Sequence, residues 1–203
     1  MGWWLRIRLV PAVCAGLVLC MALGAAADSI TVPVPVVVGG ISFPLPLPFL
    51  LPLVPVCILL QGQSRADTGL DSTAVRAVRI WDAAFTTLCA VAALLVGLVE
   101  AVATDQALGI GMARNFLGYL GIALLLQVLA GARVASAVVS LFPILCAAFG
   151  IRYGTPSVWA WPLHEPSSLS ALTQAGILFA VGLTASAATT LAPAILPTRD
   201  PTP

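Results

Sequence analysis

Residues 32–60, VPVPVVVGGISFPLPLPFLLPLVPVCILL, decide the fold, because the stretch is almost wholly apolar and yet contains seven prolines. Each proline removes a backbone donor, and the residue before a proline is pushed out of the α region. Residues 33–48 therefore cannot form an ordinary transmembrane helix, although their hydropathy would suggest one.

Gly39-Gly40 is a two-residue turn signal between two runs that favour β structure. A hairpin turning there pairs Val38 with Ile41, Pro35 with Pro44, and Pro33 with Pro46. Both proline pairs then fall on open positions of the ladder, where proline costs little and blocks the edges against further strands. The sequence predicts a hairpin over residues 31–47 that caps the bundle as an outer lid. The alternative interpretation is an irregular, proline-rich loop at the membrane interface.

The composition places the chain in a membrane. Of its 203 residues, 60% are hydrophobic and only 8% are charged, and a soluble domain of this length needs far more charge on its surface. All nine basic residues are arginine, which, with the abundant Ala, Gly and Pro, indicates a GC-rich bacterial source and hence the bacterial inner membrane. The net charge of +1 gives no indication of nucleic-acid binding.

Apolar segments predict an all-α polytopic membrane protein, one integral domain over residues 1–203 with the proline-rich hairpin between its first two helices. The six predicted transmembrane helices cover residues 9–27, 48–61, 83–103, 116–130, 134–149 and 169–191. The alternative to a retained helix over residues 9–27 is a signal peptide cleaved after Ala25-Ala26-Ala27. Pro55 is expected to kink the short second helix.

Arginines set the predicted orientation. With six helices, both termini and a polar loop over residues 62–80 lie in the cytoplasm, and the hairpin lies outside. Only Arg114 and Arg152 fall outside, as the positive-inside rule favours. The cytoplasmic side carries the remaining seven: Arg6, Arg8, Arg65, Arg76, Arg79, Arg133 and Arg199.

Catalytic and cofactor motifs are missing from the sequence. There is no H-E-x-x-H or G-x-S-x-G motif, and the single histidine, His164, cannot form a histidine metal cluster. No lysine is present, so there is no Walker motif and the chain cannot hydrolyse a nucleotide alone. The five cysteines lie in apolar runs without a C-x-x-C pair and are predicted to be buried thiols. We therefore expect neither an enzyme nor a bound cofactor or metal.

Four polar residues are candidates for a substrate or ion pathway. Glu100 could be a coupling carboxylate facing the bundle, or an interfacial carboxylate at a helix end. Arg114 could pair with Glu100 or Asp105 across the outer mouth, or form an exposed surface ion pair. Gln127 and Gln174 lie deep in predicted helices, where an interhelical hydrogen bond is the alternative to substrate contact.

The outer pair His164-Glu165 could form a pH-sensitive site, or lie in a solvated loop.

Two phrases carry a family resemblance: ARNFLGYLGIALL at residues 113–125 and WAWP at residues 159–162. With them, residues 76–162 resemble small six-helix membrane proteins of GC-rich bacteria that are similar to membrane subunits of ABC-type exporters. The resemblance implies a separate ATPase docked on a cytoplasmic coupling segment. The candidate residues for docking the ATPase in this chain are Asp71, Arg76 and Arg79. In the transport hypothesis that follows, the chain acts as a homo- or hetero-dimer in the lipid bilayer.

This chain departs from the exporters in having no dedicated substrate site and no long amphipathic N-terminal helix. The competing hypothesis is an accessory or structural membrane protein without a transport cycle of its own.

Overall fold

A computed structural model describes residues 2–27, 30–37, 42–65, 75–105, 107–152 and 155–188. The chain is mainly helical, as predicted, and agrees with a multi-pass membrane protein. Four helices are long and apolar enough to cross a membrane, and a fifth, Val10–Ala26, is apolar but shorter. The four are Leu47–Ser64, Ile80–Thr104, Leu108–Phe149 and Leu169–Ala188.

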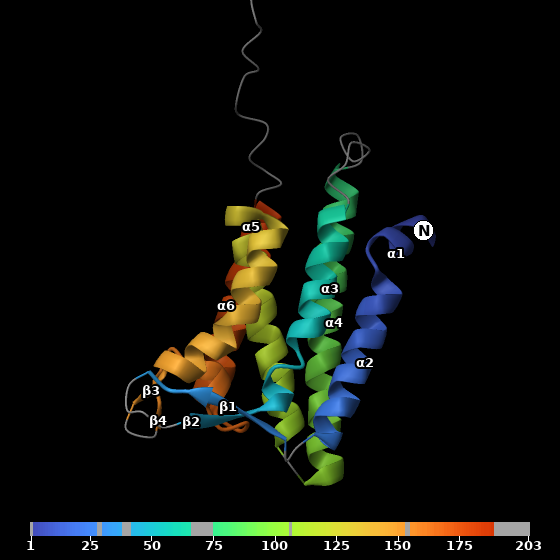
Figure 1. Ribbon diagram of the computed structural model, residues 1–203. Coiled ribbons are helices and arrows are strands. Elements are labelled where there is room, and N and C mark those ends of the chain that lie inside the picture. Colours follow the sequence, from blue (N-terminus) through green and yellow to red (C-terminus); the bar gives the residue numbers. More distant parts are fainter. Residues whose placement is uncertain are drawn as a thin grey trace, which may run out of the picture.

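The helices run roughly parallel or antiparallel to one another in a bundle (Figure 1). Helices α2 (Val10–Ala26), α3 (Leu53–Ser64) and α4 (Val75–Thr104) lie together, and α5 (Leu108–Phe149) and α6 (Leu169–Ala188) lie beside them. The short α1 (Gly2–Ile7) and the ends of α3 and α6 lie at one end of the bundle. We call this end the arginine end, because the exposed Arg6, Arg65 and Arg133 belong to it.

The hairpin and the loop after α5 lie at the opposite end (Figure 1). They contain strands β1 (Thr31–Pro35), β2 (Ser42–Pro46), β3 (Ile151–Arg152) and β4 (Thr155–Pro156), together with the 3-10 turns η1 (Leu47–Phe49) and η3 (Trp161–Leu163).

The predicted hairpin forms, but its predicted register is wrong by two residues. Pro33 lies opposite Pro44, and Pro35 lies opposite Ser42. Side chains in a strand alternate with a period of two, so a two-residue shift keeps every side chain on the same face and every proline on an open position. The predicted turn at Gly39-Gly40 lies outside the described residues.

Packing selects the observed register. Val34 and Leu45 are buried against the end of α5 and the loop that follows it, whereas Pro33, Pro35 and Pro44 on the other face are exposed. The two faces therefore have different surroundings, although both are apolar in sequence.

Helix α5 is longer at its start than predicted. It begins at Leu108 rather than at residue 116, because Gly109 and Gly111 are helical instead of forming a loop. A Cβ at Gly109 would lie 2.9 Å from the carbonyl oxygen of Gly97 in α4, and one at Gly111 would lie 3.0 Å from Cβ of Pro166. These glycines thus allow close packing of the helix. The local sequence does not show whether a glycine has this role or lies in a loop.

Gly131 breaks α5, close to the predicted turn at residues 131–133. Its φ of 83° and ψ of 164° are not helical, and its positive φ suits a residue without a Cβ. The chain reverses there, and residues 132–149 return beside residues 108–130 (Figure 1).

Helices occupy both ends of the polar loop predicted over residues 62–80. Helix α3 continues to Ser64 and α4 starts at Val75. The apolar span Leu47–Ser64 opens with the 3-10 turn η1, so Pro55 lies in the first turn of α3, which begins at Leu53. The N–H groups of a first turn have no partner within the helix, so proline is tolerated there and the reason for the predicted kink is removed.

Residues 111–121 of α5 form the centre of the bundle and are buried on every side. Small residues bring four neighbours close: Gly24 of α2 meets Met112, Gly97 of α4 meets Ala113, Gly118 meets Trp161, and Gly121 meets the backbone of α6. Of the cysteines, three are buried as predicted, but Cys14 is exposed and Cys57 is half-buried beside Ser140.

Replacing Gly121 with alanine is expected to lower the free energy of unfolding by about 1–3 kcal/mol, the usual cost of overpacking. The new Cβ would overlap the backbone of Leu178 and Phe179, which cannot move aside as a side chain could. Denaturant unfolding in mild detergent measures the loss.

Gly176→Ala is the matched control, because nothing lies within 4 Å of its new Cβ. Equal stability of the two variants would contradict the close contact between α5 and α6.

Candidate functional site

Two arginines are buried among the side chains that the structure describes, one near each end of the bundle: Arg8 is 6% exposed and Arg114 is 0% exposed. Burying a charged group is costly unless it is paired or hydrogen-bonded. The partners of these two side chains therefore show which parts of the chain must stay together.

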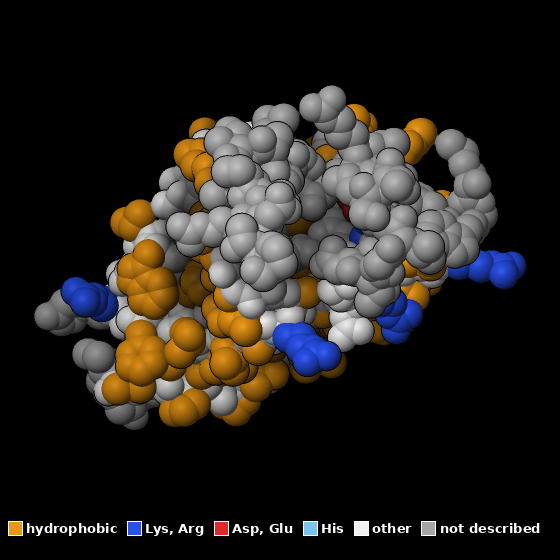
Figure 2. Space-filling view, turned by 90° about the horizontal axis from the view of Figure 1, so that it is seen from above, with side chains coloured by type: hydrophobic (Ala, Val, Ile, Leu, Met, Phe, Trp, Pro, Cys, Tyr) orange, Lys and Arg blue, Asp and Glu red, His pale blue; other side chains and the backbone are white. Residues whose placement is uncertain are grey.

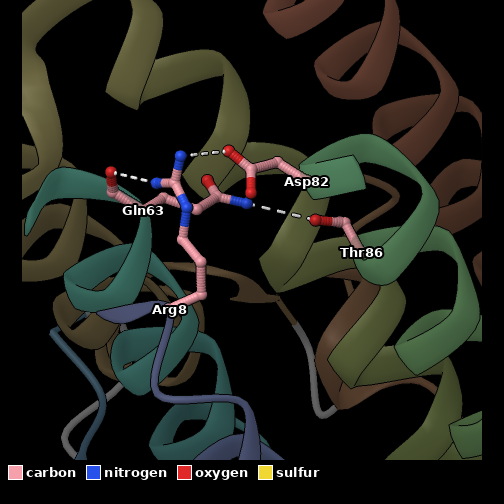
Figure 3. Close-up of polar contacts among 4 residues, drawn as sticks. All are labelled: Arg8, Gln63, Asp82 and Thr86. Atoms are coloured by element: carbon pink, nitrogen blue, oxygen red, sulfur yellow. Dashed lines mark hydrogen bonds and ion pairs between the residues drawn. The ribbon is translucent and has the colours of Figure 1, made fainter. Parts of the chain in front are cut away.

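The Arg8 cluster consists of Arg8, Gln63, Asp82 and Thr86 (Figure 3). Arg8 Nη2 lies 2.6 Å from Asp82 Oδ2 in a salt bridge, and Arg8 Nη1 donates to the carbonyl of Gln63 at 2.6 Å. Gln63 Nε2 in turn donates to Thr86 Oγ1 at 3.1 Å. These bonds join the junction of α1 and α2 to the end of α3 and the first half of α4.

The local backbone brings Arg8 inward. Leu9 is left-handed with φ 53°, so the chain bends between α1 and α2 directly after Arg8. Gly62 allows α3 to approach, because a Cβ there would overlap the carbonyl of Arg8. In the sequence, Arg8 is recognisable only as a predicted cytoplasmic charge and Asp82 is not distinguished at all, since nothing local links residues so distant along the chain.

Figure 2 views the molecule from above, that is, from the arginine end. Basic side chains project at several points of the outline, and hydrophobic side chains make up much of the visible described surface between them, as in a bundle whose sides face lipid. The Arg8 cluster joins the end of α3 to the first half of α4.

The Arg114 cluster fixes the loop between α5 and α6. Arg114 Nη1 donates to the carbonyl of Glu165 at 2.7 Å, and Nη2 donates to the carbonyls of His164 at 3.1 Å and Pro162 at 3.4 Å. Its Nε donates to Asn115 Oδ1 at 3.3 Å. The guanidinium thus binds three backbone carbonyls within residues 162–165 instead of a carboxylate.

Neighbouring residues of α5 complete this contact. Asn115 Nδ2 donates to the carbonyl of Pro162 at 3.3 Å, and Tyr119 Oη donates to the carbonyl of Phe49 in η1 at 3.1 Å. The ring of Trp161 lies over Gly118, with its centroid 5.5 Å from that of Tyr119. The two phrases that carry the family resemblance therefore pack against each other.

The predicted pairing of Arg114 with Glu100 or Asp105 is wrong, and so is the exposed alternative. Glu100 is half-buried near the end of α4. A Cβ at Gly109 would lie 2.9 Å from its Oε2, so the carboxylate stands beside the first turn of α5, where a helix favours negative charge. Arg114 points instead to the loop carbonyls described above.

Gln127 and Gln174 are half-buried in α5 and α6. Within residues 2–188 as described, neither side chain makes a hydrogen bond, so the predicted interhelical bonds are not formed there. His164 Nε2 lies 3.1 Å from the carbonyl of Ser157, a contact within its own loop, and Glu165 is exposed.

The predicted docking residues are placed only in part. Arg76 and Arg79 belong to the first two turns of α4, whereas Asp71 lies outside the described residues. The described part of the chain contains no group of three or more His, Cys, Asp or Glu side chains that could hold a metal ion.

Both clusters thus connect elements and leave their arginines engaged with fixed partners. Chemically, they can hold helices and a loop in place. No protein-family model, curated protein or solved structure matches this chain.

Proposed function

We propose that this chain is the membrane-spanning subunit of an ABC-type export system, working with a separate ATPase that docks at the arginine end. The observation that carries the proposal is the Arg8 cluster, which joins the junction of α1 and α2 to the end of α3 and the first half of α4. A partner that pushed on the end of α3 or the start of α4 would move these helices together, because buried charge-assisted hydrogen bonds link them. The chain itself supplies no nucleotide-binding motif.

The proposal includes six membrane crossings with both termini in the cytoplasm. It counts α2 and the two arms of α5 as separate crossings, in addition to α3, α4 and α6. The break at Gly131 and the antiparallel arms support this count, and the exposed Arg6, Arg65 and Arg133 support a cytoplasmic arginine end.

Cysteine labelling tests the crossings. Ser64→Cys at the end of α3 and Ser167→Cys before α6 are expected to react from opposite sides of the membrane. Reaction of both with an impermeant reagent from outside would refute the six-crossing arrangement.

Docking is tested by charge reversal. Arg76→Glu with Arg79→Glu should abolish co-purification of an ATPase in mild detergent, because these residues begin α4 at the proposed docking end. Arg133→Glu, an exposed arginine of α5 at the same end, is the matched control and should retain the ATPase. Membrane insertion of each variant is measured in parallel, because cytoplasmic arginines also set orientation.

A second candidate function is an accessory or structural membrane protein without a transport cycle. It is favoured by the engagement of Arg8 and Arg114 with fixed protein partners, which leaves neither guanidinium free for a substrate. Recovery of the native protein without any ATPase would favour this function over the first.

A further inference from the structure

The hairpin cap, which we define as residues 30–37, 42–46, 150–152 and 155–163, shows two very different surfaces. Its inner surface is a small core in which Val34 and Leu45 pack on Cys146, Ala147 and Leu163. Its outer surface includes the exposed prolines of β1 and β2. The cap is therefore attached to the bundle on one side and uncovered on the other.

The edges of the hairpin accept hydrogen bonds but barely donate them. Pro33 lies opposite Pro44, so this pair cannot be hydrogen-bonded and the ladder bonds fall on the alternate pairs. Leu47 N donating to the carbonyl of Ile30 at 2.9 Å continues the same alternation. At the open positions, backbone groups point away from the partner strand, and only Thr31 and Ser42 among them have an N–H.

This chemistry excludes two surroundings. Another strand cannot pair along an edge that offers a single N–H donor. The hydrocarbon core of a membrane cannot solvate outward carbonyls, each of which would lose its hydrogen bonds there. The edges require a medium that supplies donors, such as water or ammonium groups.

The rim of the cap is nevertheless strongly apolar. Val37 is 64% exposed, Val158 is 72% exposed and Trp159 is 47% exposed. Val37 N donates to the carbonyl of Ala148 at 3.0 Å, which places Val37 at the end of α5. There it continues the exposed apolar surface of the second arm of α5, formed by Leu141, Ile144, Leu145 and Phe149.

We infer that the hairpin cap lies in the headgroup layer of the bilayer, with Val37, Val158 and Trp159 inserted at the boundary with the acyl chains. An apolar rim joined to carbonyl edges fits this layer, where aromatic side chains gather and where water and lipid ammonium groups donate hydrogen bonds. The exposed Arg152 of the same loop is placed to meet lipid phosphates. The inference requires a membrane-spanning bundle but no ATPase partner.

Tryptophan quenching in nanodiscs of phosphatidylethanolamine and phosphatidylglycerol tests the placement. The emission of Trp159 is obtained as the difference between the unaltered protein and Trp159→Phe. Lipids brominated near the headgroup are expected to remove most of this emission, lipids brominated near the chain end to remove less, and aqueous iodide to remove little.

Two added reporters extend the measurement. Val37→Trp should behave as Trp159 does, whereas Leu95→Trp, on the exposed apolar face of α4, should be quenched more by deep bromine than by shallow bromine. Trp159→Phe changes only an exposed side chain, so the first difference remains measurable if Val37→Trp fails to fold. Strong iodide quenching of Trp159 without bromolipid quenching would overturn the inference in favour of water or a soluble partner. If lipids brominated near the chain end quenched Trp159 more strongly than they quench Leu95→Trp, the inference would be overturned in favour of the hydrocarbon core.

Discussion

Arg114→Ala is expected to lower the free energy of unfolding by on the order of 3–5 kcal/mol, because buried acceptors lose a charged donor. The carbonyls of Pro162, His164 and Glu165 would lose their bonds to the guanidinium at once. We expect the loop before α6 to detach from α5 and to become sensitive to protease in mild detergent. Denaturant unfolding measures the stability, and mass spectrometry of the cleaved chain locates the loop.

Two further variants separate charge from geometry. Arg114→Lys keeps the charge but not the planar fork of donors, so an intermediate loss is expected. Arg152→Ala removes an exposed arginine from the same end of the molecule and should change stability little. A protected loop and full stability in Arg114→Ala would show that the guanidinium does not hold the loop.

Asp82→Ala is expected to cost about 3–5 kcal/mol, since it leaves Arg8 buried without its counter-charge. The salt bridge is 2.6 Å long, and the two side chains are only 7% and 16% exposed, so water screens the pair weakly. We expect α1 to separate from α3 and α4 as Arg8 moves to water. Denaturant unfolding and protease cleavage near residue 9 measure the two effects.

The double variant Arg8→Met with Asp82→Leu is the informative control. Replacing both buried charges by apolar side chains of similar size is often neutral, because the desolvation cost disappears with the charges. Recovery of most of the lost stability would show that an unpaired charge, and not a lost contact, damages the single variant. A double variant as unstable as Asp82→Ala would contradict this explanation.

The hairpin shows where inference from sequence succeeds and where it stops. Prolines at alternate positions predict a hairpin with undamaged ladder bonds, and the structure confirms the hairpin and the alternation. The alternation of prolines does not distinguish the predicted register from the observed one, which differs by two residues. A shift of two leaves every side chain on its face and every residue in its hydrogen-bonded or open position. In the part of the hairpin that the structure describes, the packing of Val34 and Leu45 on the end of α5 favours the observed register.

The buried arginines were beyond local inference for a different reason. Arg114 was expected at an exposed outer mouth because Gly109 and Gly111 resemble a loop in sequence. Their lack of a Cβ is used instead for close contact with α4 and with Pro166, so α5 starts earlier and Arg114 becomes buried. Its partners are backbone carbonyls, which every residue possesses and which therefore leave no mark in the sequence.

By itself, the sequence determined the properties that follow from composition and short-range periodicity. These are the apolar helices, the break near Gly131, the hairpin and the asymmetric placement of arginine. Tertiary structure alone decided the strand register, the start of α5 and the partners of Arg8 and Arg114. The physical reason is that local rules depend on backbone geometry within a few residues, whereas these features depend on which distant surfaces meet and on which buried groups must then be hydrogen-bonded.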